Sequence, residues 1–174
     1  MRSLIIVLLI TLLNGNNLFA QKSDCNLLTD RETEEGHIKS TRRTAMIDLP
    51  DNAFGIILQN YSGNLKMLID WAFSTKKITQ KFTIANNNSV TFILKNGHAI
   101  QFEIKEPQRG AGSLRQSWGN YEVGGMINFS AAQADTLLQA PIASMLLSYY
   151  GLPADTINTV EAKDYFIKTV PCIK

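Results

Sequence analysis

Apolar and polar side chains alternate along most of the chain, with the period of two that is typical of β-strands. The clearest run covers residues 65–73, where every odd position is apolar and the even positions include Lys66 and Asp70. Similar runs cover residues 43–49, 54–59, 78–84, 90–95, 98–105, 121–129 and 142–150. The connections between these runs are short, which indicates that neighbouring strands pair antiparallel.

An Asn-Gly pair at residues 96–97 specifies the register of one hairpin. A two-residue loop there would place Phe92 opposite Gln101, and therefore an apolar side chain opposite a polar one on the same face. A three-residue loop that begins one residue earlier, with the glycine in the left-handed conformation, instead pairs Phe92 with Ile100. We therefore predict the three-residue loop.

Two segments change to a helical period. Ser130 and Gln133 form a capping box, and the apolar positions that follow share one face until Pro141, which predicts a short helix at residues 131–139. The second segment, capped within residues 158–161, carries Phe166 inward and places Asp164 four residues before Lys168. A strand is the alternative for this second segment.

These elements predict a single globular α+β domain over residues 21–174. The expected architecture is a strongly twisted antiparallel sheet of about seven to eight strands, curling around its apolar face, with two short helices in the C-terminal third. The composition agrees with this, because 45% apolar and 18% charged residues exclude disordered, collagen-like and repeat-array chains.

Residues 1–20 are predicted to be a secretory signal peptide. Arg2 supplies a positive charge, residues 4–13 are apolar except for Thr11, and the small Ala20 precedes the expected cleavage point. A membrane anchor is the alternative, but this run is about half of the ~20 residues that cross a bilayer. We therefore expect a secreted or periplasmic protein with no stable membrane insertion.

Cys25 and Cys172 are the two cysteines of the chain, and they lie near the two ends of the expected mature protein. In an oxidising compartment such a pair most often forms one disulfide. A reactive thiol is the alternative, but neither cysteine has a neighbouring histidine or a Cys-x-x-Cys spacing. We predict a Cys25–Cys172 disulfide that ties the two ends of the domain together.

The charges predict neither nucleic acid nor an anionic membrane as a partner. The net charge of +2 comes from 17 basic and 15 acidic residues that are scattered along the chain, without a long run of one sign.

Signatures of catalysis are missing from the sequence, so we assign no catalytic residue, no metal ligand and no cofactor. His37 and His98 are the two histidines. His37 lies in a charged stretch that offers no closing partner for a metal site, and His98 follows a turn. Asp70 lies on the polar face of the clearest strand, where a solvated carboxylate is the expected role and a buried, paired one is the alternative.

Residues 106–120 form a glycine-rich stretch that is long enough for a functional loop. A binding site for an anion or a sugar within this stretch would use Arg109, Arg115 and Trp118. A solvated hairpin loop, with Trp118 packed back on the sheet, is the alternative. A dinucleotide fingerprint beginning at residue 110 is disfavoured, because Arg115 occupies the place of the third glycine.

The order of these parts resembles a class of small, uncharacterised exported bacterial proteins. The resemblance rests on the signal peptide, an early Cys25, many short strands, the passage from helix to strand after Ser130, and a final amphipathic segment with Cys172. It implies export and a β-rich α+β domain, and it transfers no activity.

Three functions remain as hypotheses. The first is an exported, non-catalytic binding or interaction protein whose partner is a protein or small molecule of the cell envelope. The second is a carrier with a small apolar ligand in a β-barrel cavity, which requires a lined pocket of several hundred Å³. The third is an enzyme of unfamiliar type that uses carboxylates such as Asp70 or Glu103, which requires two carboxylates converging in a cleft.

Overall fold

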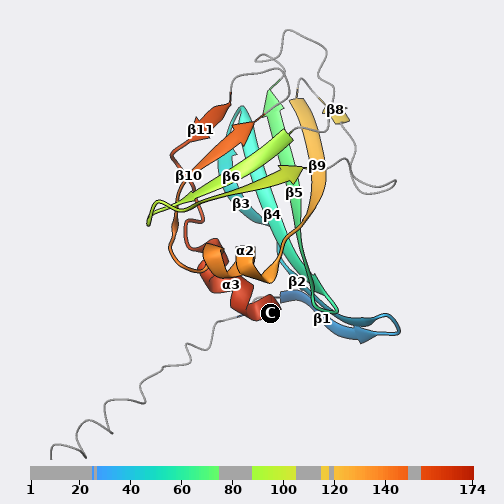
Figure 1. Ribbon diagram of the computed structural model, residues 1–174. Coiled ribbons are helices and arrows are strands. Elements are labelled where there is room, and N and C mark those ends of the chain that lie inside the picture. The colour runs from blue at the N-terminus through green and yellow to red at the C-terminus, as the bar shows by residue number, and fades with distance from the viewer. Residues whose placement is uncertain (1–24, 26, 75–87, 105–114, 118–119, 149–153) are drawn as a thin grey trace, which may run out of the picture.

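The computed structural model describes residues 25, 27–74, 88–104, 115–117, 120–148 and 154–174. Within these residues the chain forms two antiparallel sheets and two helices (Figure 1). The predicted antiparallel α+β class is therefore confirmed, with its strands divided between two sheets in place of one. The described strands form no closed barrel.

The larger sheet has seven strands, in the order β1-β2-β4-β5-β9-β8, with β3 also paired to β4. Its strands are β1 (Leu27–Thr33), β2 (Gly36–Thr41), β3 (Thr44–Leu49), β4 (Asn52–Tyr61), β5 (Asn64–Ser74), β8 (Arg115–Ser117) and β9 (Asn120–Asn128). The smaller sheet has the order β11-β10-β6-β7. Its strands are β6 (Asn88–Leu94), β7 (Ala99–Ile104), β10 (Ile142–Ser148) and β11 (Asp155–Ile157). Helices α2 (Ala131–Leu137) and α3 (Tyr165–Ile173) lie together at one end of the two sheets (Figure 1).

The core lies between the two sheets and is closed at the helical end by α2 and α3. The apolar face predicted for β5 is buried there, including Leu65 and Trp71. The Trp71 ring packs edge-on against Phe54, with centroids 6.0 Å apart, and its indole N–H donates to the side-chain oxygen of Asn52 at 2.9 Å. Phe166 of α3 packs against Phe92 of β6 in the same way, at 4.9 Å. Large aromatic side chains from both sheets and a helix therefore fill this interior.

The β6–β7 hairpin has the predicted three-residue loop. Phe92 pairs with Ile100 and Val90 with Phe102. Gly97 has φ +86°, the left-handed conformation that a glycine adopts without strain. The hydrophobic pattern on both strands therefore selected the register.

The structure confirms the predicted start of helix α2 and corrects the predicted start of helix α3. Ser130 and Gln133 form the predicted capping box of α2. Helix α3 begins later than predicted, at Tyr165, with Asp164 at its N-cap, and the residues from Glu161 to Asp164 form turns. The helical alternative is nevertheless correct for this segment, and Phe166 is buried as predicted.

Strand β1 with the hairpin that it forms with β2, and the three-residue strands β8 and β11, were not predicted from the alternation of residues. Strand β1 has the sequence LLTDRET, in which charged residues replace the apolar positions of a half-buried strand. Figure 1 shows the β1–β2 hairpin extending away from the body of the molecule, so little of it needs an apolar face. The strand predicted at residues 78–84 lies outside the described residues.

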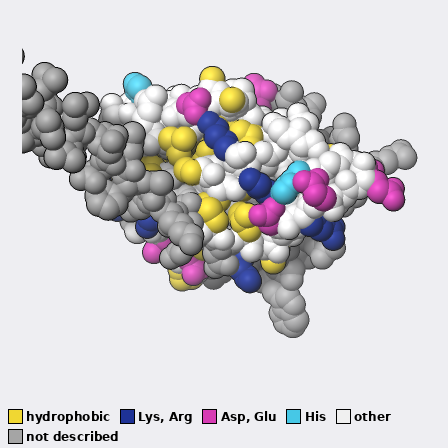
Figure 2. Space-filling model, turned by 90° about the horizontal axis from the view of Figure 1, so that it is seen from below, with side chains coloured by type: hydrophobic (Ala, Val, Ile, Leu, Met, Phe, Trp, Pro, Cys, Tyr) yellow, Lys and Arg dark blue, Asp and Glu magenta, His cyan; other side chains and the backbone are white. Residues whose placement is uncertain are grey.

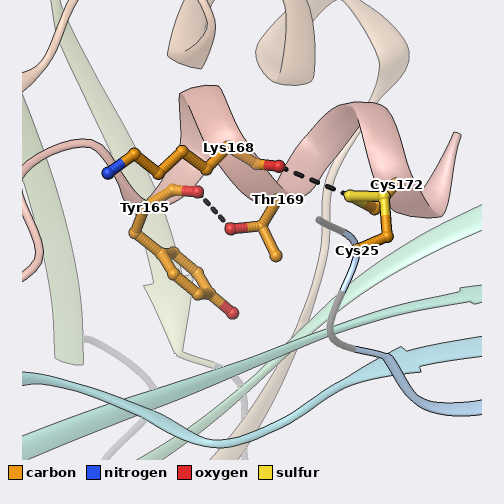
Figure 3. Close-up of a disulfide and its surroundings, with 5 residues drawn as sticks. All are labelled: Cys25, Tyr165, Lys168, Thr169 and Cys172. Carbon is orange, nitrogen blue, oxygen red and sulfur yellow. Dashed lines mark hydrogen bonds between the residues drawn. A yellow bond between two sulfur atoms is a disulfide. The ribbon is translucent and has the colours of Figure 1, made fainter. Parts of the chain in front are cut away.

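The predicted Cys25–Cys172 disulfide is present (Figure 3). It joins the chain just before β1 to the last turn of α3, with the two Cα atoms 5.5 Å apart. Tyr165, Lys168, Thr169 and Cys172 follow one another along α3, and the carbonyl oxygen of Lys168 lies 3.4 Å from the Cys172 sulfur. The final helix is therefore fastened at its C-terminal end.

Candidate functional site

A groove of about 1160 Å³ opens where β7 of the smaller sheet approaches β9 of the larger sheet. The β4–β5 turn, strand β5 and the start of α2 complete its walls. The lining residues are Gly63, Asn64, Leu65, Lys66, Gln101, Phe102, Glu103, Met126, Ile127, Asn128, Phe129, Ser130, Ala131 and Gln133. The groove therefore lies at the seam between the two sheets and not inside the packed core.

A glycine lets the two sheets meet at this seam. A Cβ atom added to Gly125 of β9 would lie 2.7 Å from Cγ2 of Ile104, the last residue of β7. Only a residue without a side chain allows this approach. The groove residues of β7 and β9 adjoin this contact along their own strands.

The groove is lined both by buried aromatic residues and by exposed polar residues. Phe102 and Phe129 pack edge-on at 6.2 Å, and both side chains are buried. The rim carries Lys66, Glu103 and Asn128, of which the last two are exposed. The lining therefore combines apolar residues with hydrogen-bonding groups, as binding sites commonly do.

Some polar groups at the rim are already occupied. The side-chain amide of Gln101 donates to the Ser89 hydroxyl at 3.1 Å. The hydroxyl of Ser130 accepts from the Gln133 backbone N–H at 3.2 Å, and the Gln133 side chain in turn accepts from the Ser130 N–H at 2.8 Å. These groups stabilise the walls, which leaves Glu103, Asn128 and the strand backbones for a ligand.

Sequence reasoning named Glu103 among the groove residues but missed the others. A signal that could have indicated the seam is the Gly124-Gly125 pair within the strand predicted at residues 121–129. A glycine inside a strand marks a bulge or the close approach of another chain segment. The proximity of β7 to β9 could not be predicted from alternation, because the two strands belong to different sheets.

His37 contacts two carboxylates at the hairpin of β1 and β2. One ring nitrogen lies 2.6 Å from Asp30 and the other 2.5 Å from Glu32, both on β1. These two hydrogen bonds raise the pKa of His37 above its ordinary value, Asp30 contributing most. His37 therefore has two carboxylate partners, both from a strand that the sequence pattern did not reveal.

Asp70 is exposed, as expected, and it is also paired. Its carboxylate accepts a hydrogen bond from Nε of Arg43 at 2.5 Å. The pair lies over Gly55 of β4, whose added Cβ would come within 2.2 Å of Asp70 and 2.5 Å of Arg43. Asp70 therefore takes part in a surface ion pair between β5 and the segment before β3, away from the groove residues.

A second hollow, of about 360 Å³, lies between α3 and strands β1 to β3, beside the disulfide. Tyr165 lies at its edge, with its hydroxyl 3.1 Å from the hydroxyl of Thr41. The Thr41 hydroxyl also accepts a hydrogen bond from the backbone N–H of Leu58 at 2.9 Å. Burial raises the pKa of Tyr165, so the phenol stays neutral and joins α3 to the larger sheet.

The predicted ligand residues of the glycine-rich stretch are only partly described. Arg109 and Trp118 lie outside the described residues. Arg115 begins β8 and pairs with Glu122 of β9 in the strand register. His98 is exposed between the Asn96 turn and β7, and its backbone N–H donates to the Asn96 side chain at 3.2 Å.

The surface at the helical end is mixed in charge. Figure 2 shows acidic, basic and hydrophobic side chains next to one another on this face, without a large area of one sign. Lys174 pairs there with Asp135 of α2. In the described part of the chain, no group of three or more His, Cys, Asp or Glu side chains is arranged to hold a metal ion. No helix among the same residues is long and apolar enough to span a membrane.

Comparison with known proteins identified no relationship to this chain. No family model matches its sequence, and neither a curated protein nor a solved structure is significantly similar to it.

Proposed function

We propose that this chain is an exported, non-catalytic binding protein whose ligand site is the groove between β7 and β9. The observation that carries the proposal is the groove itself, whose lining includes buried aromatic residues and exposed polar groups. Its partner would be a protein or a small molecule of the cell envelope. The Cys25–Cys172 disulfide is compatible with a protein outside the cytoplasm, and the sequence of residues 1–20 supports export.

The two alternatives have less support. A carrier of an apolar ligand needs an apolar cavity, whereas Trp71, Phe54 and Phe92 fill the space between the sheets. An enzyme of the carboxylate type needs two converging acids, and Glu103 is the one carboxylate among the described residues that line the groove. Asp70 is held by Arg43 elsewhere.

The test is a ligand screen with a structural readout. The oxidised, isotope-labelled protein is titrated with pooled short peptides, with oligosaccharides and with palmitate, while its amide resonances are followed. We expect a ligand to shift the resonances of Gln101, Glu103, Met126 and Asn128. Shifts centred on Trp71 with palmitate would favour the carrier, and shifts confined to α3 would contradict the groove.

A groove-filling variant tests the same site. Glu103→Trp places a large side chain at an exposed position of β7, and Thr156→Trp places the same side chain at an exposed position of β11, on the opposite edge of the same sheet. We expect the first variant to reduce binding at least about tenfold and the second to leave it unchanged. Glu103→Gln separates the loss of charge from the filling of the groove.

A further inference from the structure

The free edges of the two sheets differ in how they are protected from pairing with another chain. Strand β1 carries Asp30, Arg31 and Glu32 along its edge, and β8 and β11 are only three residues long. Strand β3 is covered by the connection before α3, where the Glu161 N–H donates to the Met46 carbonyl at 3.0 Å. Charge, shortness and cover are the usual means by which proteins block unwanted strand addition.

Strand β7 and the second half of β9 are less protected, with Glu103 as the one charged side chain in these two segments. Strand β7 is six residues long, with the sequence AIQFEI, and contains neither Lys nor Pro. It pairs with β6 on one side, and no described strand pairs with its other side. Strand β8 pairs only with the residues of β9 from Asn120 to Glu122, so Met126 and Asn128 lie beyond its reach. Both of these edges border the groove.

The pairing pattern shows which backbone groups face outward. The Leu94 N–H donates to the His98 carbonyl at 2.8 Å, so the alternation of an antiparallel ladder directs the N–H and C=O groups of Gln101 and Glu103 away from β6.

The same reasoning applies to β9. The Phe129 N–H donates to the Leu65 carbonyl at 3.2 Å, so the backbone groups of Met126 and Asn128 point away from β5. These two residues and the two outward-facing residues of β7 all line the groove.

We propose, on the basis of the proposed function, that the ligand is an extended polypeptide segment of a partner protein, which adds to β7 as a further strand and lies between β7 and β9. Backbone hydrogen bonds to Gln101 and Glu103 hold the segment. Its side chains alternate, with apolar ones toward Phe102 and Phe129 and polar ones toward the rim at Lys66 and Glu103. A volume of about 1160 Å³ exceeds most small-molecule pockets and accommodates several extended residues.

A proline substitution tests the backbone contact directly. Because the Glu103 N–H points away from β6, Glu103→Pro removes an outward donor and leaves the β6–β7 hydrogen bonds in place. Glu103→Ala removes the side chain and keeps the donor. The probes are acetylated nine-residue peptides that alternate valine with threonine and include one Lys and one Glu. We expect Glu103→Pro to bind the peptide about tenfold or more weakly than Glu103→Ala, because both variants lack the carboxylate and only the proline variant also lacks the backbone donor.

Amide hydrogen exchange supplies a second readout. The peptide should slow exchange at Gln101 and Glu103 in the parent protein, because these amides become part of a ladder. Thermal melts of each variant verify folding, and Asn128→Pro with Asn128→Ala repeats the comparison on β9 if the first proline variant unfolds.

The possible outcomes separate the two proposals. Equal binding by Glu103→Pro and Glu103→Ala, or groove shifts with oligosaccharides but none with peptides, would overturn strand addition and leave the groove as the binding site. Groove resonances that respond to no probe would overturn both. A dimer in sedimentation that Glu103→Pro dissociates would identify a second copy of the chain as the occupant and contradict a partner peptide.

Discussion

At the scale of single residues, two glycines illustrate how a close contact is tolerated or required. Both Gly55 and Gly125 lie in strands of the larger sheet, and an added Cβ would meet other atoms at less than 3 Å in each case. At Gly55 those atoms are the ends of the exposed Arg43 and Asp70 side chains, which can move. At Gly125 the nearest atom belongs to Ile104, whose side chain is buried.

The first prediction compares these two positions. Gly125→Ala should lower the free energy of unfolding by about 1–3 kcal/mol, because the methyl group overpacks the contact between β9 and β7. Gly55→Ala should change it by less than about 0.5 kcal/mol, since it displaces only an exposed ion pair. Urea denaturation of both variants measures the difference. Equal effects would mean that the seam does not depend on Gly125.

The second prediction concerns His37 and pH. Its pKa in the folded protein lies above the unfolded value of 6.5, because Asp30 and Glu32 bind the protonated ring. The folded state therefore binds more protons between the two pKa values, and the resulting stabilisation is complete below pH 6.5 and is lost as the pH rises through the folded pKa. We expect the urea midpoint of the parent to fall over this interval.

His37→Gln is the matched variant, because it keeps a polar side chain and cannot be protonated. Its urea midpoint should decrease less over the same pH interval, while His98→Gln should behave like the parent. A parent and a His37→Gln variant with the same pH dependence would show that the three side chains do not interact in solution.

At the scale of elements, the sequence predicts those whose side chains have to face a core. Strands with one buried face, such as β5, carry the alternation that burial demands, and the register of β6 with β7 follows from the same requirement. Strand β1 extends away from the body of the molecule and needs no apolar face, so its charged sequence lacks the alternation that predicts a strand. The start of α3 was misplaced because the residues that resemble a cap at 158–161 form the connection that covers β3.

The third prediction belongs to helix α2. Ser130→Ala removes the side-chain oxygen that accepts the Gln133 N–H, which should cost about 1 kcal/mol of stability. Because the helix is seven residues long and follows β9 directly, the loss should loosen the wall of the groove. We expect faster amide exchange in α2 and weaker groove binding, whereas Thr136→Ala, at the other end of the helix, serves as the control. Unchanged exchange in α2 would exclude a role for the cap.

At the scale of the whole molecule, the groove could be predicted only in parts. Its position depends on the order of strands in two sheets, which places β7 beside β9 although the two are separated by β8 and two stretches of chain outside the described residues. Periodicity identifies the faces of strands but not their neighbours across a seam. The glycines of β9 and the acid at Glu103 were visible in the sequence, whereas their proximity was not.

The last prediction concerns reduction of the disulfide, which joins two cysteines with a sequence separation of 147. Removing a native disulfide from a small domain typically costs 2–5 kcal/mol, and the Cys25→Ser, Cys172→Ser double variant should fall within about this range. The two tethered ends should respond differently. Helix α3 buries Phe166, Val170 and Ile173 in the core, whereas β1 is a charged edge strand with no fully buried residue.

Reduction should therefore release β1 first, and hydrogen exchange should rise in residues 27–33 before it rises in α3. The amides that line the groove on β7 and β9 lie in other strands and should keep their exchange rates, so ligand binding should survive reduction. Simultaneous release of β1 and α3 would show that the disulfide holds the helix as well. Loss of groove binding on reduction, with the core still protected, would show that the seam between the sheets depends on the tie between the chain ends.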